Sequence, residues 1–544
     1  MNLLLDVFGF LSVLLRCLAL VGSALVVGGV VFRHLIVLPV ADVALGPTRE
    51  VLTRINRVLR GSALLLAFTA TATALLDTMV MIGSVDMAPL LAASAPSNVA
   101  FLAITLGALA LLTRYGEGGV RAPLAALLVL IGMVCTTHSV SRLEHTALMI
   151  GASTLHQVGA YCWLGGLPYF LVVLNRATAA DRARLALRYS HLCVAGVAMI
   201  LLSAVLKAWF YIGSVAAVYG SQYGAMSATK FAMLLTLLCF GAGNFLAARR
   251  LAGDVALLDR VRRFVEVEMI IGLAVMFVAG ALTSLPPAVD LGADLAPWPA
   301  VKERVFTPRA PRLSSPDASE LAIPQAQARL DALAAAEHTR ALPVYVPGAG
   351  LSPPVTAADV VWSEYNHNWS GIFVLAIGLV ALLAQAGWRP ARHWPLLFFV
   401  LGIFVLLRSD PESWPIGDIG FFAAMRAPEV LQHRLAVLTV FIFALFEWRV
   451  RRGTLAGTRA EYVFPATNVI GGILLLAHSH DLNNQQEALL MELSHLGLGL
   501  FAVAAGCARW LEIRASGRMQ RIAGWVWPWC FVGLGLVLIL YRES

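Results

Sequence analysis

Residues 135–167, CTTHSVSRLEHTALMIGASTLHQVGAYCWLGGL, form the predicted hairpin around which the fold is organised. Two apolar helices meet at a short polar turn, with His138 ending the first helix, His145 in the turn and His156 inside the second. A histidine in a membrane-spanning helix is rare, because a polar side chain in hydrocarbon is costly unless it is paired or bound to a metal. One such residue could simply bond a neighbouring helix, but two across one hairpin favour a functional site.

The composition is that of a membrane protein. Of the 544 residues, 59% are hydrophobic and 13% are charged, and the mean hydropathy is +0.78. A soluble globular domain has about 25% charged residues, so this class is excluded. The net charge of +8 is explained by membrane topology, and the sequence contains no nucleic-acid-binding motif.

Apolar runs long enough to cross a bilayer recur along the chain. A helix needs about 20 residues to cross roughly 30 Å of hydrocarbon. The sequence therefore predicts an all-α polytopic membrane protein with about 14 transmembrane helices in two bundles. Their expected extents are 8–31, 61–83, 98–113, 121–138, 146–174, 190–213, 226–248, 264–285, 369–387, 393–408, 430–448, 462–479, 488–508 and 523–541.

The basic residues alternate between successive loops. Several arginines follow the first predicted helix, whereas the next loop, 84–98, holds none. Because basic residues concentrate in cytoplasmic loops, we predict that both termini of this inner-membrane protein are periplasmic. The first helix lacks a basic leader and a small-residue cleavage site, so we expect it to be retained. Most of the 12 histidines then fall on the outer side, as a metal-acquiring surface requires.

Three parts follow from the composition along the chain. Residues 1–288 form an eight-helix membrane block. Residues 289–361 are rich in Pro and Ala and form a predicted periplasmic insert, partly disordered or a small cap. Residues 362–544 form a second, six-helix membrane block.

The first block carries a family resemblance. After His138 and LHQVGAYCWLGGL (155–167) come QYGAMSATKF (222–231) and VEVEMIIGLAVMFVAGALTSLPP (265–287). Together these motifs resemble the CopD family of bacterial copper-resistance and copper-uptake membrane proteins, over about residues 1–288. The resemblance implies that copper ions are carried through, or held within, the cytoplasmic membrane for copper homeostasis. It also implies a periplasmic copper-binding partner of the CopC type.

Further polar residues of the first block lie in predicted membrane segments. Asp77 and Lys207 are both predicted in the outer half of the membrane, so we expect them to pair or to border a hydrated cavity. Glu268 is predicted at the cytoplasmic end of its helix, as an exit ligand or as a partner of Arg262 or Arg263. Thioethers suit Cu(I), although packing is the simpler role for a methionine. The candidates for a polar path are Asp77, Lys207, Lys230, Glu268, Met79 and Met81.

The second block carries carboxylates and imidazoles on its predicted outer side. E-x-x-H motifs occur at 364–367 and 492–495, and a Glu and a His lie four apart at 429–433. Because three or four residues make one helical turn, each pair can face one centre. The alternative is that they are solvated helix-end residues. The candidate metal ligands of the whole chain are His138, His145, His156, Glu364, His367, Glu429, His433, His478, His480, Glu492 and His495.

Three functions fit these observations. The first is the binding and transport of copper, as Cu(I) or Cu(II), without catalysis. The second is electron transfer through haem b, with His156 and either His138 or His495 as axial ligands. The third is a membrane oxidoreductase whose second block holds a His and Glu metal centre. The sequence contains no P-loop or CPC motif, which argues against an ATP-driven pump.

Overall fold

The computed structural model describes residues 2–41, 47–84, 87–113, 120–142, 144–248, 250–251, 254–336, 356–477 and 485–543. Within these ranges the chain is all-α, apart from one isolated bridge between Ser413 and Ile419. The chain divides into an N-terminal unit, Phe10–Leu295, and a C-terminal unit, Ala296–Ser544 together with Met1–Gly9. Residues 296–336 of the predicted insert therefore group with the C-terminal unit.

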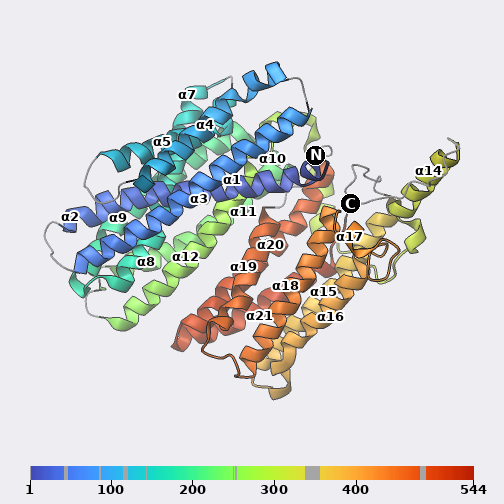
Figure 1. Cartoon of the computed structure of the whole chain (residues 1–544). Coiled ribbons are helices and arrows are strands. Elements are labelled where there is room, and N and C mark those ends of the chain that lie inside the picture. The colour runs from blue at the N-terminus through green and yellow to red at the C-terminus, as the bar shows by residue number, and fades with distance from the viewer. Residues whose placement is uncertain are drawn as a thin grey trace. The chain divides into compact units, whose positions relative to one another are not determined.

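The long helices of the N-terminal unit have roughly parallel axes (Figure 1). Helix α7 packs along α9, α4 packs between α3 and α5, and α11 packs along α12. The helices are α1 (Asn2–Val31), α2 (Leu38–Ala41), α3 (Pro47–Ser84), α4 (Met87–Thr113), α5 (Arg121–Cys135), α6 (His138–Ser141), α7 (Thr146–Trp163), α8 (Leu167–Arg176), α9 (Ala179–Lys207), α10 (Val215–Gly220), α11 (Gln222–Ala248) and α12 (Val255–Leu282).

The junction between α7 and α8 lies directly against α1. Gly165 is in the 3-10 turn Leu164–Gly166, where an added Cβ would collide with the carbonyl oxygen of Ala24. Tyr169 donates a hydrogen bond of 2.8 Å to the carbonyl of Leu25. Only glycine lets two backbones approach this closely. The turn therefore fixes α7, which carries the candidate site, against the core of the unit.

The C-terminal unit has its own set of helices. Among its membrane-type helices, α15 packs along α21, α21 along α20, and α20 along α19. The helices are α13 (Trp298–Phe306), α14 (Ala322–Ala336), α15 (Ala357–Gln385), α16 (Leu397–Arg408), α17 (Phe421–Ala424), α18 (Pro428–Arg451), α19 (Val463–Leu476), α20 (Gln485–Arg514) and α21 (Gly517–Ile539).

An aromatic cluster forms the core of the C-terminal unit. Trp394 and Trp527 lie 5.1 Å apart between ring centroids, and Phe464 stacks on Phe531 at 5.8 Å. Phe398 meets Phe531 edge-on at 5.9 Å. Such offset and edge-to-face pairs add to the free energy gained from burying the rings.

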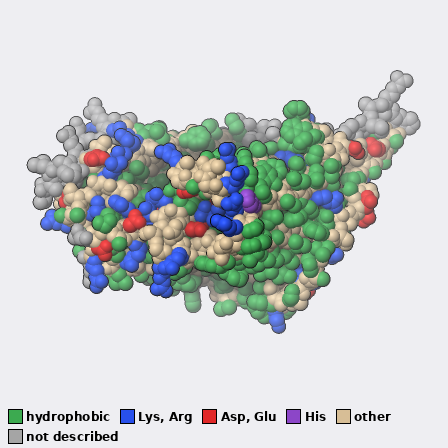
Figure 2. All heavy atoms as spheres, turned by 90° about the horizontal axis from the view of Figure 1, so that it is seen from below, with side chains coloured by type: hydrophobic (Ala, Val, Ile, Leu, Met, Phe, Trp, Pro, Cys, Tyr) green, Lys and Arg blue, Asp and Glu red, His purple; other side chains and the backbone are tan. Residues whose placement is uncertain are grey.

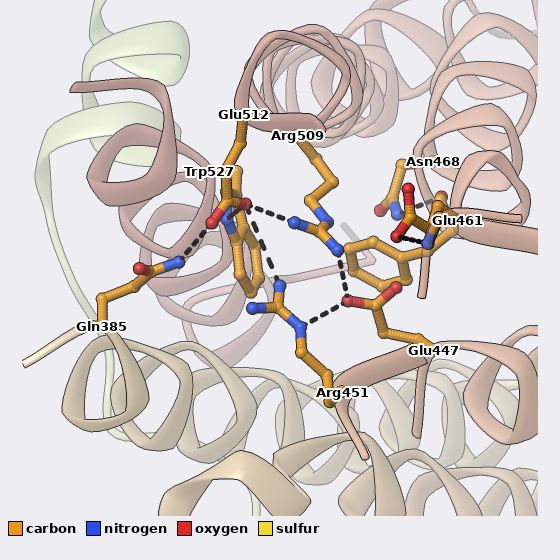
Figure 3. A network of polar contacts seen from close by, with 10 residues as sticks. Gln385, Glu447, Arg451, Glu461, Asn468, Arg509, Glu512 and Trp527 are labelled. Atoms are coloured by element: carbon orange, nitrogen blue, oxygen red, sulfur yellow. Dashed lines mark hydrogen bonds and ion pairs between the residues drawn. The ribbon is translucent and has the colours of Figure 1, made fainter. Parts of the chain in front are cut away.

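A buried network of ion pairs lies next to this core (Figure 3). Glu447, whose side chain is fully buried, accepts hydrogen bonds from Arg451 at 2.7 Å and Arg509 at 3.0 Å. Arg509 also pairs with Glu512 at 2.6 Å. The Arg451 guanidinium lies over both indoles of the aromatic core. Glu512 accepts two further hydrogen bonds, from Gln385 and Trp527. Charges this deep are stable only because each is paired.

The membrane character of the fold is confirmed. Eleven helices are long and apolar enough to cross a membrane in the part of the chain that the structure describes. Figure 2 shows a broad area of hydrophobic side chains, with Lys and Arg gathered beside it. The predicted runs 98–113 and 121–138 correspond to the shorter helices Val99–Leu112 and Arg121–Cys135, and the run 462–479 to the 14-residue α19. The count of fourteen and the periplasmic termini remain predictions.

Candidate metal path

One end of the N-terminal unit contains a cavity of about 510 Å³, which we call the mouth cavity. Helix α6, the start of α7 and the segment after α12 form it. It combines imidazole, thioether and carboxylate groups, which are the ligand types that copper accepts. Its lining residues are His138, Arg142, Glu144, His145, Met149, Phe210, Pro287 and Asp290.

The turn between α6 and α7 shapes the mouth cavity. His145 precedes α7 with a left-handed backbone, φ 54°, which is uncommon outside glycine, and its ring lies 5.1 Å from that of Phe210. Arg142 donates two hydrogen bonds, 3.0 and 3.1 Å, to Asp290. Burial and then the charge of Arg16 lower the pKa of His138. This imidazole is therefore neutral near pH 7, which is the form that binds metals.

Three buried hydroxyl groups form a cluster, and two of them belong to residues that directly follow His138 and Phe210 of the mouth cavity. The Ser139 hydroxyl lies 2.5 Å from that of Ser153 and 3.0 Å from that of Tyr211. All three residues are at most 4% exposed. The Tyr211 ring in turn lies 6.2 Å from that of Tyr223, which lines a second cavity. The hydroxyl cluster therefore joins α6, α7 and the segment after α9 through side-chain hydrogen bonds.

The second cavity, which we call the inner cavity, has a volume of about 580 Å³ and lies between α7, α9, α11 and α12. His156 lines it, with Nδ1 held 2.9 Å from the Ser203 hydroxyl. That contact leaves Nε2 as the ring nitrogen for a further ligand. Lys207 and Lys230 line the same cavity. Its remaining walls are largely apolar.

Glu268 lies in the middle of α12, 2% exposed, where Asn244 donates a 2.6 Å hydrogen bond to it. The prediction that it ends its helix near the cytoplasm is wrong, because α12 begins at Val255. Arg263 pairs instead with Asp259 and Glu266. Arg262 donates to the carbonyl of Leu174.

The sequence left two alternatives for Asp77 and Lys207, either an ion pair with each other or a place beside a cavity, and their surroundings distinguish the two. No ion pair joins them within the described ranges; Lys207 borders the inner cavity, and Asp77 faces the charge of Arg16. Met79 is 55% exposed. The side chain of Met81 lies outside the described residues.

In the C-terminal unit, His433 is held by a residue that the sequence motifs did not single out. Its Nδ1 lies 2.9 Å from Asp410, which also pairs with Arg434 at 3.1 Å. Burial raises the pKa of Asp410, but the hydrogen bond and charge of His433, together with Ser409 and Arg434, lower this pKa overall. Glu429, four residues before His433, is exposed.

His367 and His495 both contact Tyr541, which the sequence motifs also missed. The His367 ring stacks on Tyr541 at 3.9 Å, and the His495 ring meets it edge-on at 6.2 Å. Glu364 forms an ion pair with Arg312, whereas Glu492 is 1% exposed. The two histidines of the E-x-x-H motifs thus share the Tyr541 ring, whereas Glu364 pairs with Arg312.

No group of three or more His, Cys, Asp or Glu side chains is placed to hold a metal ion among the described residues. His478 and His480 lie outside those residues, so the metal site of the second block stays a prediction. His138 and His156 line different cavities, and the structure does not bring them together as a pair of haem ligands.

The loop that carries Asp410 predicts a pH effect on stability. Burial raises the pKa of Glu412 to about 7, above the ordinary value of about 4.3. The folded state therefore holds this proton more tightly, and the stability it contributes is lost as the pH rises through about 7. In Glu412→Gln this fall should disappear, as measured by thermal unfolding of the purified chain from about pH 5 to 8.

Asp418→Asn is the matched control, because Asp418 is exposed in the same loop. It should keep the wild-type pH profile. Equal slopes for Glu412→Gln and wild type would contradict the assignment to Glu412.

Part of the chain is similar to proteins named for copper resistance or copper transport. Residues 183–282 match the family model of copper resistance protein D, CopD. The chain is also 27% identical over 162 residues to the copper transport protein CutJ of Bacillus subtilis (strain 168). That match covers 29% of this chain and 29% of CutJ, so the chain spans under a third of this relative's length. No solved structure matches. The predicted resemblance to CopD is thereby confirmed over α9, α11 and α12.

Proposed function

We propose that this protein takes copper ions at the periplasmic face of the cytoplasmic membrane and passes them across it, for copper homeostasis or resistance. The observation that carries the proposal is the succession of two histidine-lined cavities along α7. This helix packs against α9, within the segment that matches copper resistance protein D. The role is binding and transport, without catalysis, and a periplasmic copper-binding protein of the CopC type delivers the ion.

The mouth cavity is the entry site in this proposal. The imidazoles of His138 and His145 accept either copper ion, and the thioether of Met149 favours Cu(I). Asp290 is neutralised by Arg142, as described above, which leaves Glu144 as the other carboxylate of the cavity. In this proposal the imidazole, thioether and carboxylate groups of the cavity bind copper without forming a fixed coordination shell.

The inner histidine is the next ligand along the path. His156 follows Met149 by seven residues of α7, or roughly 10 Å of helix. Ser153 lies between Met149 and His156 on α7, and the hydroxyl cluster that it forms with Ser139 and Tyr211 would supply oxygen atoms to an ion in passage.

The distribution of arginines supports the orientation. Arg182 and Arg188 lie near the start of α9, whereas the mouth cavity lies near Phe210, just beyond its end. Arg176, at the end of α8, and Arg262 lie at the same level as the start of α9. Since basic residues concentrate on the cytoplasmic side, the mouth cavity belongs on the periplasmic side.

His156→Ala tests the proposal. Removing the only imidazole that lines the inner cavity should lower copper accumulation by cells about 10-fold or more, because even indirect partners of a metal ligand are worth 10–100-fold. Copper content is measured by mass spectrometry after a pulse of copper, at equal amounts of the protein in the membrane.

His191→Ala is the matched control, since His191 is exposed on α9 and lines neither cavity. It should accumulate copper as wild type does. Wild-type accumulation by His156→Ala would overturn the path, and a haem absorption band in the purified protein would replace copper transport by electron transfer.

A further inference from the structure

The inner cavity is lined by basic side chains and by no acidic one among the described residues. Two lysines and one histidine line it, and none of its other lining residues is Asp or Glu. No ion pair joins Lys207 or Lys230 to a carboxylate within the described residues. The whole chain has only three lysines and otherwise uses arginine. Two of the three thus meet in one cavity inside the membrane-spanning part of the N-terminal unit.

Two ammonium groups in such surroundings need a negative partner. A charged side chain within the hydrocarbon region is costly unless it is paired or hydrated. A copper ion alone would add a third positive charge beside His156. An anionic occupant would offset the two lysines, and it would also reduce the repulsion met by a copper ion that reaches His156.

The cavity also opens onto apolar surface. Leu201 and Val205 of α9 and Phe231 of α11 line it, and they are 41%, 69% and 54% exposed. Helix α9 packs mainly against α7, and α11 packs mainly against α12, whereas α9 and α11 have few contacts with each other. In a bilayer such an opening faces acyl chains, so an amphiphile can enter from the lipid. The volume of about 580 Å³ is in the range of small-ligand sites.

We infer that the inner cavity binds an anionic amphiphile, with its head group on Lys207 and Lys230 and its acyl chain between α9 and α11. The shared chemistry is a carboxylate or phosphate on a hydrocarbon chain, supplied by a free fatty acid or by an anionic phospholipid. Lysine suits this role because its ammonium is a compact charge with three rotatable donors. The inference does not depend on copper.

The test uses the full chain, purified in a zwitterionic detergent with copper removed by a chelator. Palmitate, methyl palmitate, phosphatidylglycerol and phosphatidylcholine are titrated separately, and bound ligand is counted by native mass spectrometry. Palmitate or phosphatidylglycerol should bind with a stoichiometry of one, and whichever binds identifies the source. Methyl palmitate and phosphatidylcholine, which carry no net negative charge, should bind at least about 10-fold more weakly. Equal binding of palmitate and its ester would overturn the inference.

Variants locate the site. The double variant Lys207→Gln/Lys230→Gln should lose at least about 10-fold in affinity, whereas Lys207→Arg, which keeps the charge, should retain binding. Lys302→Gln is the matched control, because Lys302 is exposed in α13. Unchanged affinity in the double variant would also overturn the inference. If that variant does not fold, the comparison of palmitate with its ester still decides.

Discussion

Glu447→Ala should lower the free energy of unfolding by about 3–5 kcal/mol, because it leaves buried guanidinium groups without their carboxylate. Arg451 and Arg509 both donate to Glu447, whose side chain is fully buried. Arg509 keeps Glu512 as a partner, but Arg451 then retains only a 3.9 Å approach to that residue. Denaturant unfolding in detergent, followed by tryptophan fluorescence, measures the change.

Glu303→Ala is the control for a carboxylate in an exposed ion pair. Glu303 pairs with Arg309, and both side chains are more than half exposed. The loss there should be within about 0–1 kcal/mol. A loss of similar size in Glu447→Ala would show that the network contributes no more than a surface pair.

Gly165→Ala should be strongly destabilising. The new methyl group would collide with the backbone carbonyl of Ala24, which cannot rotate away as a side chain can. Overpacking of this kind costs about 1–3 kcal/mol or more. The variant should show a lower melting temperature, and less of it should run as a single peak in detergent gel filtration.

Gly151→Ala provides the opposite expectation in α7. An added Cβ at Gly151 meets nothing within 4 Å, so the higher helix propensity of alanine should leave stability unchanged or raise it by up to about 1 kcal/mol. If Gly165→Ala were as stable as Gly151→Ala, the close crossing of α1 with this turn would be wrong.

The all-α membrane fold could be predicted because length and hydropathy identify spanning helices almost without tertiary information. Helix boundaries were harder to predict where charged residues extend a helix beyond its apolar run. The helix that contains the run predicted from residue 264 begins at Val255, since Arg262 and Arg263 are part of it and find hydrogen-bond or ion-pair partners there. Glu268 was misplaced for that reason.

The candidate site was predictable where its residues lie close together in the sequence. The hairpin motif contains both His138 and His156, but not the partners that separate them into two cavities. Tyr211, in the π-helical segment Ala208–Ile212 after α9, reaches Ser139 across 72 positions of sequence, and no spacing rule connects such residues. The cavity lining supplied by Lys207 and Lys230 has the same origin, because α7, α9 and α11 border one cavity only in the folded unit.

The E-x-x-H motifs show the limit of arguments from spacing. One helical turn places Glu364 and His367 near each other, yet each has a stronger partner in another segment. Glu364 pairs with Arg312, and His367 stacks on Tyr541. Side-chain direction along one helix therefore did not decide these contacts, because tertiary partners competed for the same groups.

The buried ion-pair network constrains how the C-terminal unit can move. Gln385 ends α15, Glu447 and Arg451 lie in the last turns of α18, and Glu512 lies near the end of α20. Together with Trp527 of α21 they tie four helices at one level (Figure 3). Sliding any one of these helices by a turn would separate charges inside the protein. We therefore expect α15, α18, α20 and α21 to keep their register at this level when the unit moves.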